Sequence, residues 1–372
     1  MTIADASDPA SAITFSDDAT GLNQAERIAV LRNLAGIKHC IYKDNAVVYY
    51  LNEDNYAQKA DGTASDLTGT AGDVMIEYTV APVKYTTNGN AIEVKISDTE
   101  QDGFSPSYFQ YGDNRATKFY SGKFPGIVVG GVLRSYYSTS DKPTGSLSRK
   151  QFAAAAAAHG AGYRYSIDLP LTEMYIKTLD LFAYGNRDIQ TACGKGNVSN
   201  TTAIPVGANI SLTGGLTQGD QTGTTGVCVL GRVNQHGDMS KFIDGMYWLD
   251  GNIYHTVKNN DLWDIEQNIS TMPATWRSIP AGLPTNWSTS YITAALGDQY
   301  LPWIPKLAGG TGSGSTAYYT DACWSNTGAR CCLAGGTWDN GLHCGLFAFD
   351  ANNAPSRAAS WVGARLLCFG TE

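Results

Sequence analysis

The chain has 372 residues, 43% of them hydrophobic, so it can bury the core of one large domain or of two ordinary ones. Its 34 acidic and 26 basic residues give a formal charge of −8, which opposes non-specific attraction to nucleic acids and anionic membranes. We therefore expect no nucleic-acid partner, and no apolar run is long enough to predict membrane insertion.

The N-terminus shows no secretory signal, and the cysteines and histidines show no metal-binding motif. The first eighteen residues have neither the basic nor the apolar region of a secretory signal, so we expect no export by that route. The eight cysteines show no C-x-x-C spacing and the five histidines show no ligand spacing, so no metal site is predicted. Free thiols are expected, with a late disulfide formed outside the cell left open.

The N-terminal third reads as a mainly β module. Short alternating runs such as 46–51 and 73–80 are separated by Asn, Asp and Gly turns, and one segment, 21–31, has the apolar spacing of a short helix. We expect this module, residues 1–124, to act as an anchor.

From residue 125 the pattern changes to a compact α+β unit that continues to residue 372. Ser148 and Gln151 have the spacing of a capping box before an alanine-rich helix, and 163–167 predicts a strand. Asp168 is expected to cap a second helix, and Asp250-Gly251 predicts a hairpin turn. The expected architecture is α+β, with two helices, short antiparallel strands and many loops.

Several segments of this second unit follow one another in a distinctive order. They are Gly185–Gln190 (GNRDIQ), Phe242–Gly245 (FIDG), Leu301–Trp303 (LPW), Arg330–Gly336 (RCCLAGG), Thr337–Gly341 (TWDNG), Pro355-Ser356 and Val362–Leu366 (VGARL). This series resembles the variable proteins of diversity-generating retroelements, whose C-terminal domain is a C-type lectin fold of the formylglycine-generating-enzyme subtype. The segment 74–77 is similar, more weakly, to modules of phage tail-fibre proteins.

The resemblance implies a ligand-binding surface in a variable region of about 322–365. In the family, adenine-specific reverse-transcription errors rewrite chosen codons, typically Asn codons, which then cannot encode Lys, Glu, Gln, Met or Trp. The first four of these residues do not occur between Ala322 and Arg365. The tryptophans there cannot derive from Asn codons: we interpret Trp338 as part of the scaffold, and Trp324 and Trp361 as fixed or as derived from codons that end in G. The alignment nominates as variable positions Thr337, Asp339, Asn340, Leu342, His343, Ala348, Asp350, Arg357, Ala359, Ser360 and Trp361, with an upstream set of Ala322, Trp324, Ser325, Thr327 and Ala329.

The function implied is receptor or ligand binding without catalysis, metal or cofactor. The expected ligand is a protein or glycan on a host cell or another surface, and the expected location is a virion tail fibre, with a cell surface as the alternative. A homo-oligomer is compatible with this role. A lectin-like binder of fixed sequence and an enzyme of the formylglycine-generating type are the alternatives. The enzyme would need a pair of reactive cysteines after the Gly-Gly-x-Trp segment, and 346–366 has no cysteine.

Overall fold

The computed structural model describes residues 1–5, 11–104, 109–111, 114–160, 164–256, 272–283, 289–295, 298, 300–310 and 319–370. This part of the chain is a mixed α/β structure with many strands and few helices. The mixed, strand-rich class expected from the sequence is therefore confirmed.

One sheet has seven strands and is antiparallel throughout. In spatial order its strands are β14 (Tyr165–Ile167), β26 (Leu366–Phe369), β11 (Lys118–Gly122), β6 (Asp73–Thr79), β3 (Lys38–Lys43), β4 (Ala46–Asn52) and β5 (Asn55–Lys59). Strands from both sides of the boundary expected at residue 124 thus share one sheet. The division into two domains stays a prediction.

A second sheet, of nine strands, is formed by the later part of the chain. Its main path is β19 (Trp276–Pro280), β18 (Asn252–Thr256), β17 (Ser240–Leu249), β23 (Ala329–Gly335), β24 (Gly345–Ala351), β22 (Ala322–Ser325), β20 (Ser290–Ala295) and β21 (Pro305–Gly310), and β25 (Val362–Gly363) joins β17. Two of its pairings are parallel, β22 with β24 and β17 with β25.

Smaller sheets complete the strands. A four-stranded sheet consists of β2 (Ile13–Thr14), β1 (Thr2–Ile3), β8 (Ala91–Ile96) and β7 (Val83–Asn88). Two-stranded pairs are formed by β9 (Phe109–Tyr111) with β10 (Asn114–Ala116), β12 (Ile127–Val129) with β13 (Val132–Arg134), and β15 (Cys228–Val229) with β16 (Arg232–Val233).

The helices form where the local sequence signals them. They are α1 (Gln24–Leu34), α2 (Arg149–Ala157), α3 (Pro170–Tyr184) and α4 (Ile189–Cys193). Ser148 and Gln151 form the expected capping box at α2, and Asn23 and Glu26 form one at α1. No helix among the described residues is long and apolar enough to cross a membrane.

The predicted cap of α3 is wrong. Leu169 is the N-cap residue and Pro170 opens the helix, because proline at the first helical position loses no hydrogen bond. The Asp168 carboxylate instead accepts a hydrogen bond from Arg232 at 2.8 Å. A charge brought in from β16 therefore decides the orientation of this side chain.

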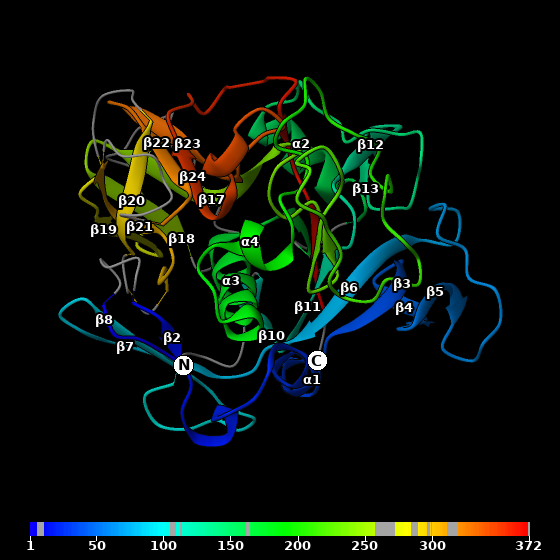
Figure 1. Ribbon diagram of the computed structural model, residues 1–372. Coiled ribbons are helices and arrows are strands. Elements are labelled where there is room, and N and C mark those ends of the chain that lie inside the picture. Colours follow the sequence, from blue (N-terminus) through cyan, green and yellow to red (C-terminus); the bar gives the residue numbers. More distant parts are fainter. Residues whose placement is uncertain are drawn as a thin grey trace.

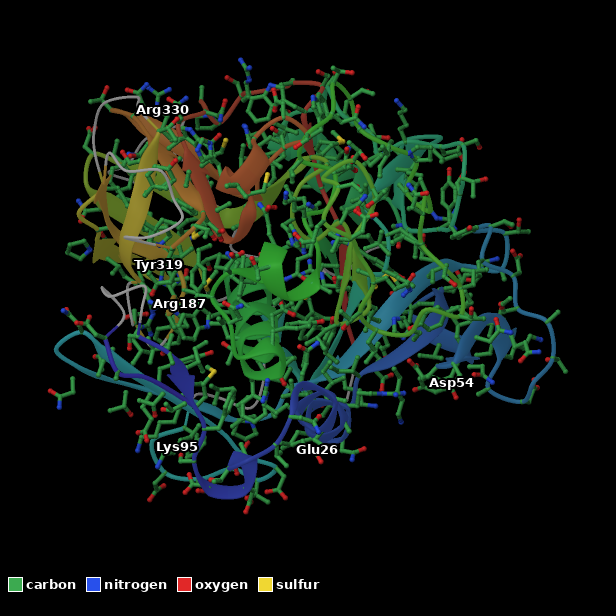
Figure 2. All side chains as sticks on the ribbon, in the orientation of Figure 1. Glu26, Asp54, Lys95, Arg187, Tyr319 and Arg330 are labelled. Carbon is green, nitrogen blue, oxygen red and sulfur yellow. The ribbon has the colours of Figure 1, made fainter. Side chains whose placement is uncertain are left out.

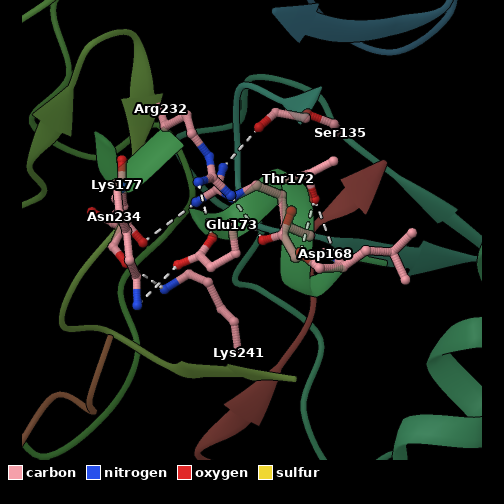
Figure 3. A network of polar contacts seen from close by, with 12 residues as sticks. Ser135, Asp168, Thr172, Glu173, Lys177, Arg232, Asn234 and Lys241 are labelled. Carbon is pink, nitrogen blue, oxygen red and sulfur yellow. Dashed lines mark hydrogen bonds and ion pairs between the residues drawn. The ribbon is translucent and has the colours of Figure 1, made fainter. Parts of the chain in front are cut away.

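Helix α3 occupies the centre of the molecule, and it packs against α1 and β17 (Figure 1). Figure 3 shows the buried charged cluster around its first turns, where Arg232 also contacts Glu173 at 3.3 Å, and Glu173 lies 3.8 Å from Lys177. Because such pairs are costly to break once buried, they fix α3 relative to β16. Because α3 also packs against β17, the cluster supports one strand of the nine-stranded sheet.

A buried arginine near the C-terminus joins distant segments of the chain. Arg365 donates to the carbonyl oxygens of Gly122 at 2.8 Å and Val233 at 2.6 Å, and its side chain is fully buried. Because its two terminal guanidinium nitrogens donate to backbone carbonyls on two distant segments, Arg365 links β11 and β16 to the residues that precede β26. The segment 362–366 singled out from the sequence is therefore part of the framework.

Candidate functional site

The candidate site is a surface hollow of about 610 Å³ whose lining includes residues of β17, β22, β23 and β24 in the nine-stranded sheet. It is lined by Ser240, Trp324, Arg330, Thr337, Trp338, Asp339, Asn340, Asp350, Asn352, Asn353, Ala354, Arg357 and Trp361. All but Ser240 come from residues 324–361. One continuous stretch of chain therefore makes almost the whole hollow.

Strand register brings the first two side chains together. On the parallel pair β22 and β24, Trp324 lies opposite Asp350. Neighbouring residues of a strand point to opposite faces, so Cys323 and Ser325 on either side of Trp324 are buried. The indole of Trp324 is held by a hydrogen bond from Nε1 to Thr289 Oγ1 at 3.0 Å.

A tight turn after β23 presents the next group. Gly335 and Gly336 have φ of +92° and +80°, a backbone conformation that favours glycine, and they turn the chain into Thr337. The Thr337 N–H then donates to Asn340 Oδ1 at 3.0 Å, and the Thr337 hydroxyl donates to Asp339 Oδ1 at 2.5 Å. These local bonds fix the loop that carries Trp338, Asp339 and Asn340.

Asp350 organises the opposite wall. Its carboxylate accepts from the Asn352 N–H at 2.7 Å and from Asn353 Nδ2 at 2.9 Å. Burial raises the pKa of Asp350 to about 6, against the opposing effect of these hydrogen bonds and of the Arg357 charge. The Asp350 side chain therefore stabilises the turn at residues 352–353 near neutral pH.

The last wall is a loop that ends at β25. Arg357 is exposed, and its guanidinium carbon lies 5.3 Å from the centre of the Trp361 ring. The Trp361 carbonyl accepts from the Ser240 N–H at 3.1 Å, which fixes the end of the loop to β17. Within the described residues, the Arg357 guanidinium makes no hydrogen bond and no ion pair.

Seven of the positions predicted from the sequence line the hollow. They are Trp324, Thr337, Asp339, Asn340, Asp350, Arg357 and Trp361. His343 lies beside it, with its ring 6.1 Å from that of Trp324 and Nε2 3.0 Å from the Tyr291 hydroxyl. Leu342, Thr327, Ala329, Ala359 and Ser360 are exposed or partly exposed but do not line the hollow.

Three predicted positions lie in the interior and not on a surface. Ala322 and Ala348 are 0% and 1% exposed, and Ser325 is 2% exposed. The reason is that β22 and β24 are inner strands of the sheet, covered on both faces over these residues. In this structure the three side chains are out of reach of a ligand at the surface, and their assignment as variable positions stays a prediction.

Sequence reasoning missed six lining residues. Asn352 and Asn353 stand in the segment where the resemblance implies rewritten Asn codons, so their residue type was a usable signal. Trp338 was assigned to the scaffold, and Arg330 and Ala354 carried no signal of their own. Ser240 reaches the hollow only through the parallel pairing of β17 with β25, which no local pattern reveals.

No cysteine lines the hollow, and all eight are buried free thiols. Burial raises the pKa of the Cys323, Cys331 and Cys344 thiols, which keeps them protonated. Within the described ranges no three His, Cys, Asp or Glu side chains gather as a metal site. The polar groups of the hollow are suited to hydrogen bonding a ligand.

No protein-family model matches the chain, and no curated protein matches it. Solved structures similar to it include the Major Tropism Determinant P3c variant, at 12% identity and a TM-score of 0.31, covering 90% of this chain and 71% of that one. The U1 and M1 variants of the same protein match at 13% identity and a TM-score of 0.32, with 90% of this chain covered and 72% and 71% of theirs. TM-scores this low decide neither the fold nor the function of this chain.

Proposed function

We propose that this chain is a receptor-binding protein that attaches a virus particle to its host, and that the hollow is the surface that recognises the ligand. The observation that carries the proposal is the composition of the hollow: twelve of its thirteen lining residues come from 324–361, and they include aromatic, amide and charged side chains. Loops held on a rigid scaffold can carry such side chains without participating in the core.

The arrangement of the molecule suits this role. Arg330, which lines the hollow, lies near the top of the molecule in Figure 2, whereas Lys95 on β8 and Glu26 on α1 lie near the bottom. In the proposal, residues 125–372 form a C-type-lectin-like domain that recognises the ligand, and residues 1–124 anchor it to the virion. A cell-surface location is the alternative.

The proposal includes diversification of the hollow by a retroelement. Support comes from the absence of Lys, Glu, Gln and Met between Ala322 and Arg365, and from the asparagines Asn340, Asn352 and Asn353 in the hollow. Sequencing the DNA beside the gene tests it. We expect a near-copy of the codons for 322–365 next to a reverse-transcriptase gene, differing where the copy carries adenine. If neither is present, the chain is a binder of fixed sequence.

We propose binding without catalysis. An oxidase of the formylglycine-generating type would need accessible thiolates, whereas the hollow is lined by no cysteine. The carboxylates of Asp339 and Asp350 are engaged by Thr337 and by the 352–353 turn. These contacts are those of a structured binding surface.

Binding of the labelled chain to a panel of intact bacterial strains tests the recognition surface. We expect Arg357→Ala and Asp339→Ala to lower binding by about tenfold or more, since each removes a charged group from the hollow. The free energy of unfolding should change by about 0.5 kcal/mol or less for Arg357→Ala, because Arg357 is exposed, and by about 1 kcal/mol for Asp339→Ala, which also removes the acceptor of the Thr337 hydroxyl. Lys43→Ala, at an exposed site at the end of β3, is the control and should bind as the parent does. Unchanged binding by both hollow variants would refute the proposal.

A further inference from the structure

The hollow contains three tryptophans, Trp324, Trp338 and Trp361, and each is partly exposed. Their backbones or rings are fixed: Trp324 by its bond to Thr289, and Trp338 by its N–H donating to the Asp238 carbonyl at 3.0 Å. Rigid aromatic faces that are open to solvent bind the apolar face of a ligand at a small entropic cost. The hollow is therefore suited to bind a ligand that has a flat apolar face of C–H groups.

Around these rings stand planar polar groups of both hydrogen-bonding kinds. Amides such as Asn340 and Asn352 donate and accept, the carboxylates of Asp339 and Asp350 accept, and the guanidiniums of Arg330 and Arg357 donate. Two arginines and two aspartates line the hollow, so the formal charges of the lining balance when both carboxyls are ionised. A ligand that matches this lining carries many hydroxyl groups and no net charge.

We infer that the hollow binds a neutral oligosaccharide, an inference that rests on the proposed function and names the class of its ligand. A pyranose ring has an apolar face of C–H groups that stacks on indole and a rim of hydroxyls that both donate and accept. The volume of about 610 Å³ lies within the usual range of small-ligand sites, roughly 300–1,000 Å³.

Two other ligand classes fit less well. A protein partner would cover a surface wider than the hollow, with apolar side chains around it, and among the described residues the exposed large hydrophobic side chains are Val48, Val129 and Leu342. Only Leu342 belongs to the region of the hollow, and it does not line it. An anionic ligand such as a phosphate is attracted by Arg330 and Arg357 but repelled by Asp339 and Asp350.

A glycan microarray of bacterial and mammalian oligosaccharides, probed with the fluorescently labelled full chain, tests the inference. We expect binding to a subset of neutral oligosaccharides, unchanged by EDTA. For the best of these sugars, calorimetry should show about tenfold weaker binding by Trp361→Ala and by Trp324→Ala, and a smaller loss for Trp361→Phe, which keeps an aromatic face. Val129→Ala, at an exposed site on β12, is the matched control and should bind normally.

The result that overturns the inference is an array without binding, or sugar binding that both tryptophan variants leave intact. Treatment of bacterial cells separates this failure from failure of the proposed function. Periodate cleaves the vicinal diols of sugars, whereas protease removes protein receptors. If cell binding depends on Arg357 and Asp339 but survives periodate and is lost after protease, the carbohydrate inference fails and the recognition surface stands. If the hollow variants bind cells as the parent does, both the carbohydrate inference and the proposed function fail.

Discussion

The ammonium nitrogen of Lys123 lies 3.2 Å from Nε2 of His39, and both side chains are buried. Lys123 also donates to the Gly231 carbonyl at 3.0 Å, and His39 Nδ1 lies 2.8 Å from Glu53 Oε2. Since Lys123 donates to His39, the proton of the neutral imidazole is on Nδ1 and faces Glu53. This chain of contacts joins β3, the end of β11 and the turn at Gly231.

Replacement of Lys123 by methionine should destabilise the protein by about 1–3 kcal/mol, because the Gly231 carbonyl and His39 Nε2 lose their buried donor. Burial and the Lys123 charge lower the pKa of His39 to about 4, so this pKa should rise in the variant. Urea unfolding measures the first effect and NMR titration of the imidazole measures the second. Lys43→Met, at an exposed position, is the control. An unshifted His39 pKa would show that the Lys123 charge does not act on the imidazole.

The turn that opens the hollow depends on Gly335. A Cβ at this position would lie 2.8 Å from the Gln235 carbonyl oxygen, in addition to the cost of φ +92° for an L-residue. Gly335→Ala should therefore cost more than Gly328→Ala, where φ is +78° but a Cβ would meet nothing within 4 Å. We expect about 1–2 kcal/mol at Gly328 and at least about 1 kcal/mol more at Gly335. Equal losses in thermal or urea unfolding would contradict the proposed crowding.

Much of the local structure is predictable because its causes lie close together in the sequence. The capping box of Ser148 and Gln151 begins α2, and Asp250-Gly251 joins β17 to β18 with φ of +41° and +98° at the turn. Asp168 was misassigned because its partner, Arg232, is distant in the sequence. Local signals do not report such long-range charge pairs.

The candidate site was predictable in its position along the chain but not in the orientation of its side chains. The region 322–365, which the family resemblance nominated, holds almost all of the hollow, and its role in ligand binding stays a prediction. Which side chains face the hollow depends on strand register: Trp324 is turned to it, whereas its neighbours Cys323 and Ser325 are buried. The place of Ser240 in the lining depends on the pairing of β17 with β25. Register and long-range pairing are set by the whole sheet.

The interior placement of Ala348 gives a direct test of which positions tolerate change. Ala348→Asn should destabilise the protein by about 2–4 kcal/mol, because it forces a larger, polar side chain into a packed strand. Ser360→Asn makes a similar change at an exposed position and should stay within about 0.5 kcal/mol of the parent. Urea unfolding compares the two. A harmless Ala348→Asn would place this residue on the accessible surface after all.

The buried carboxyl of Asp321 gives the protein a distinct pH dependence. Asp321 is fully buried, and its Oδ2 accepts from the Phe347 N–H at 2.6 Å while Oδ1 accepts from the Thr320 hydroxyl at 3.1 Å. Burial raises its pKa to about 8, with the charge of Asp188 adding to the rise and that of Lys177 opposing it. At neutral pH the folded protein therefore holds a proton here that the unfolded chain has released.

Because the folded-state pKa is raised, this group stabilises the fold least at high pH: its contribution declines from pH 4 to pH 8 and then levels off. Asp321→Asn cannot titrate, and its amide oxygen can still accept from Phe347. Relative to the parent, the variant should gain up to about 1.4 kcal/mol of unfolding free energy per pH unit between pH 5 and 7, and nothing further above pH 8. Urea unfolding at several pH values measures this difference. Asp321→Ala should be less stable than Asp321→Asn throughout, since it leaves the Phe347 N–H without its acceptor. A difference between parent and Asn variant that stays constant from pH 5 to 8 would mean that Asp321 is ionised in the fold.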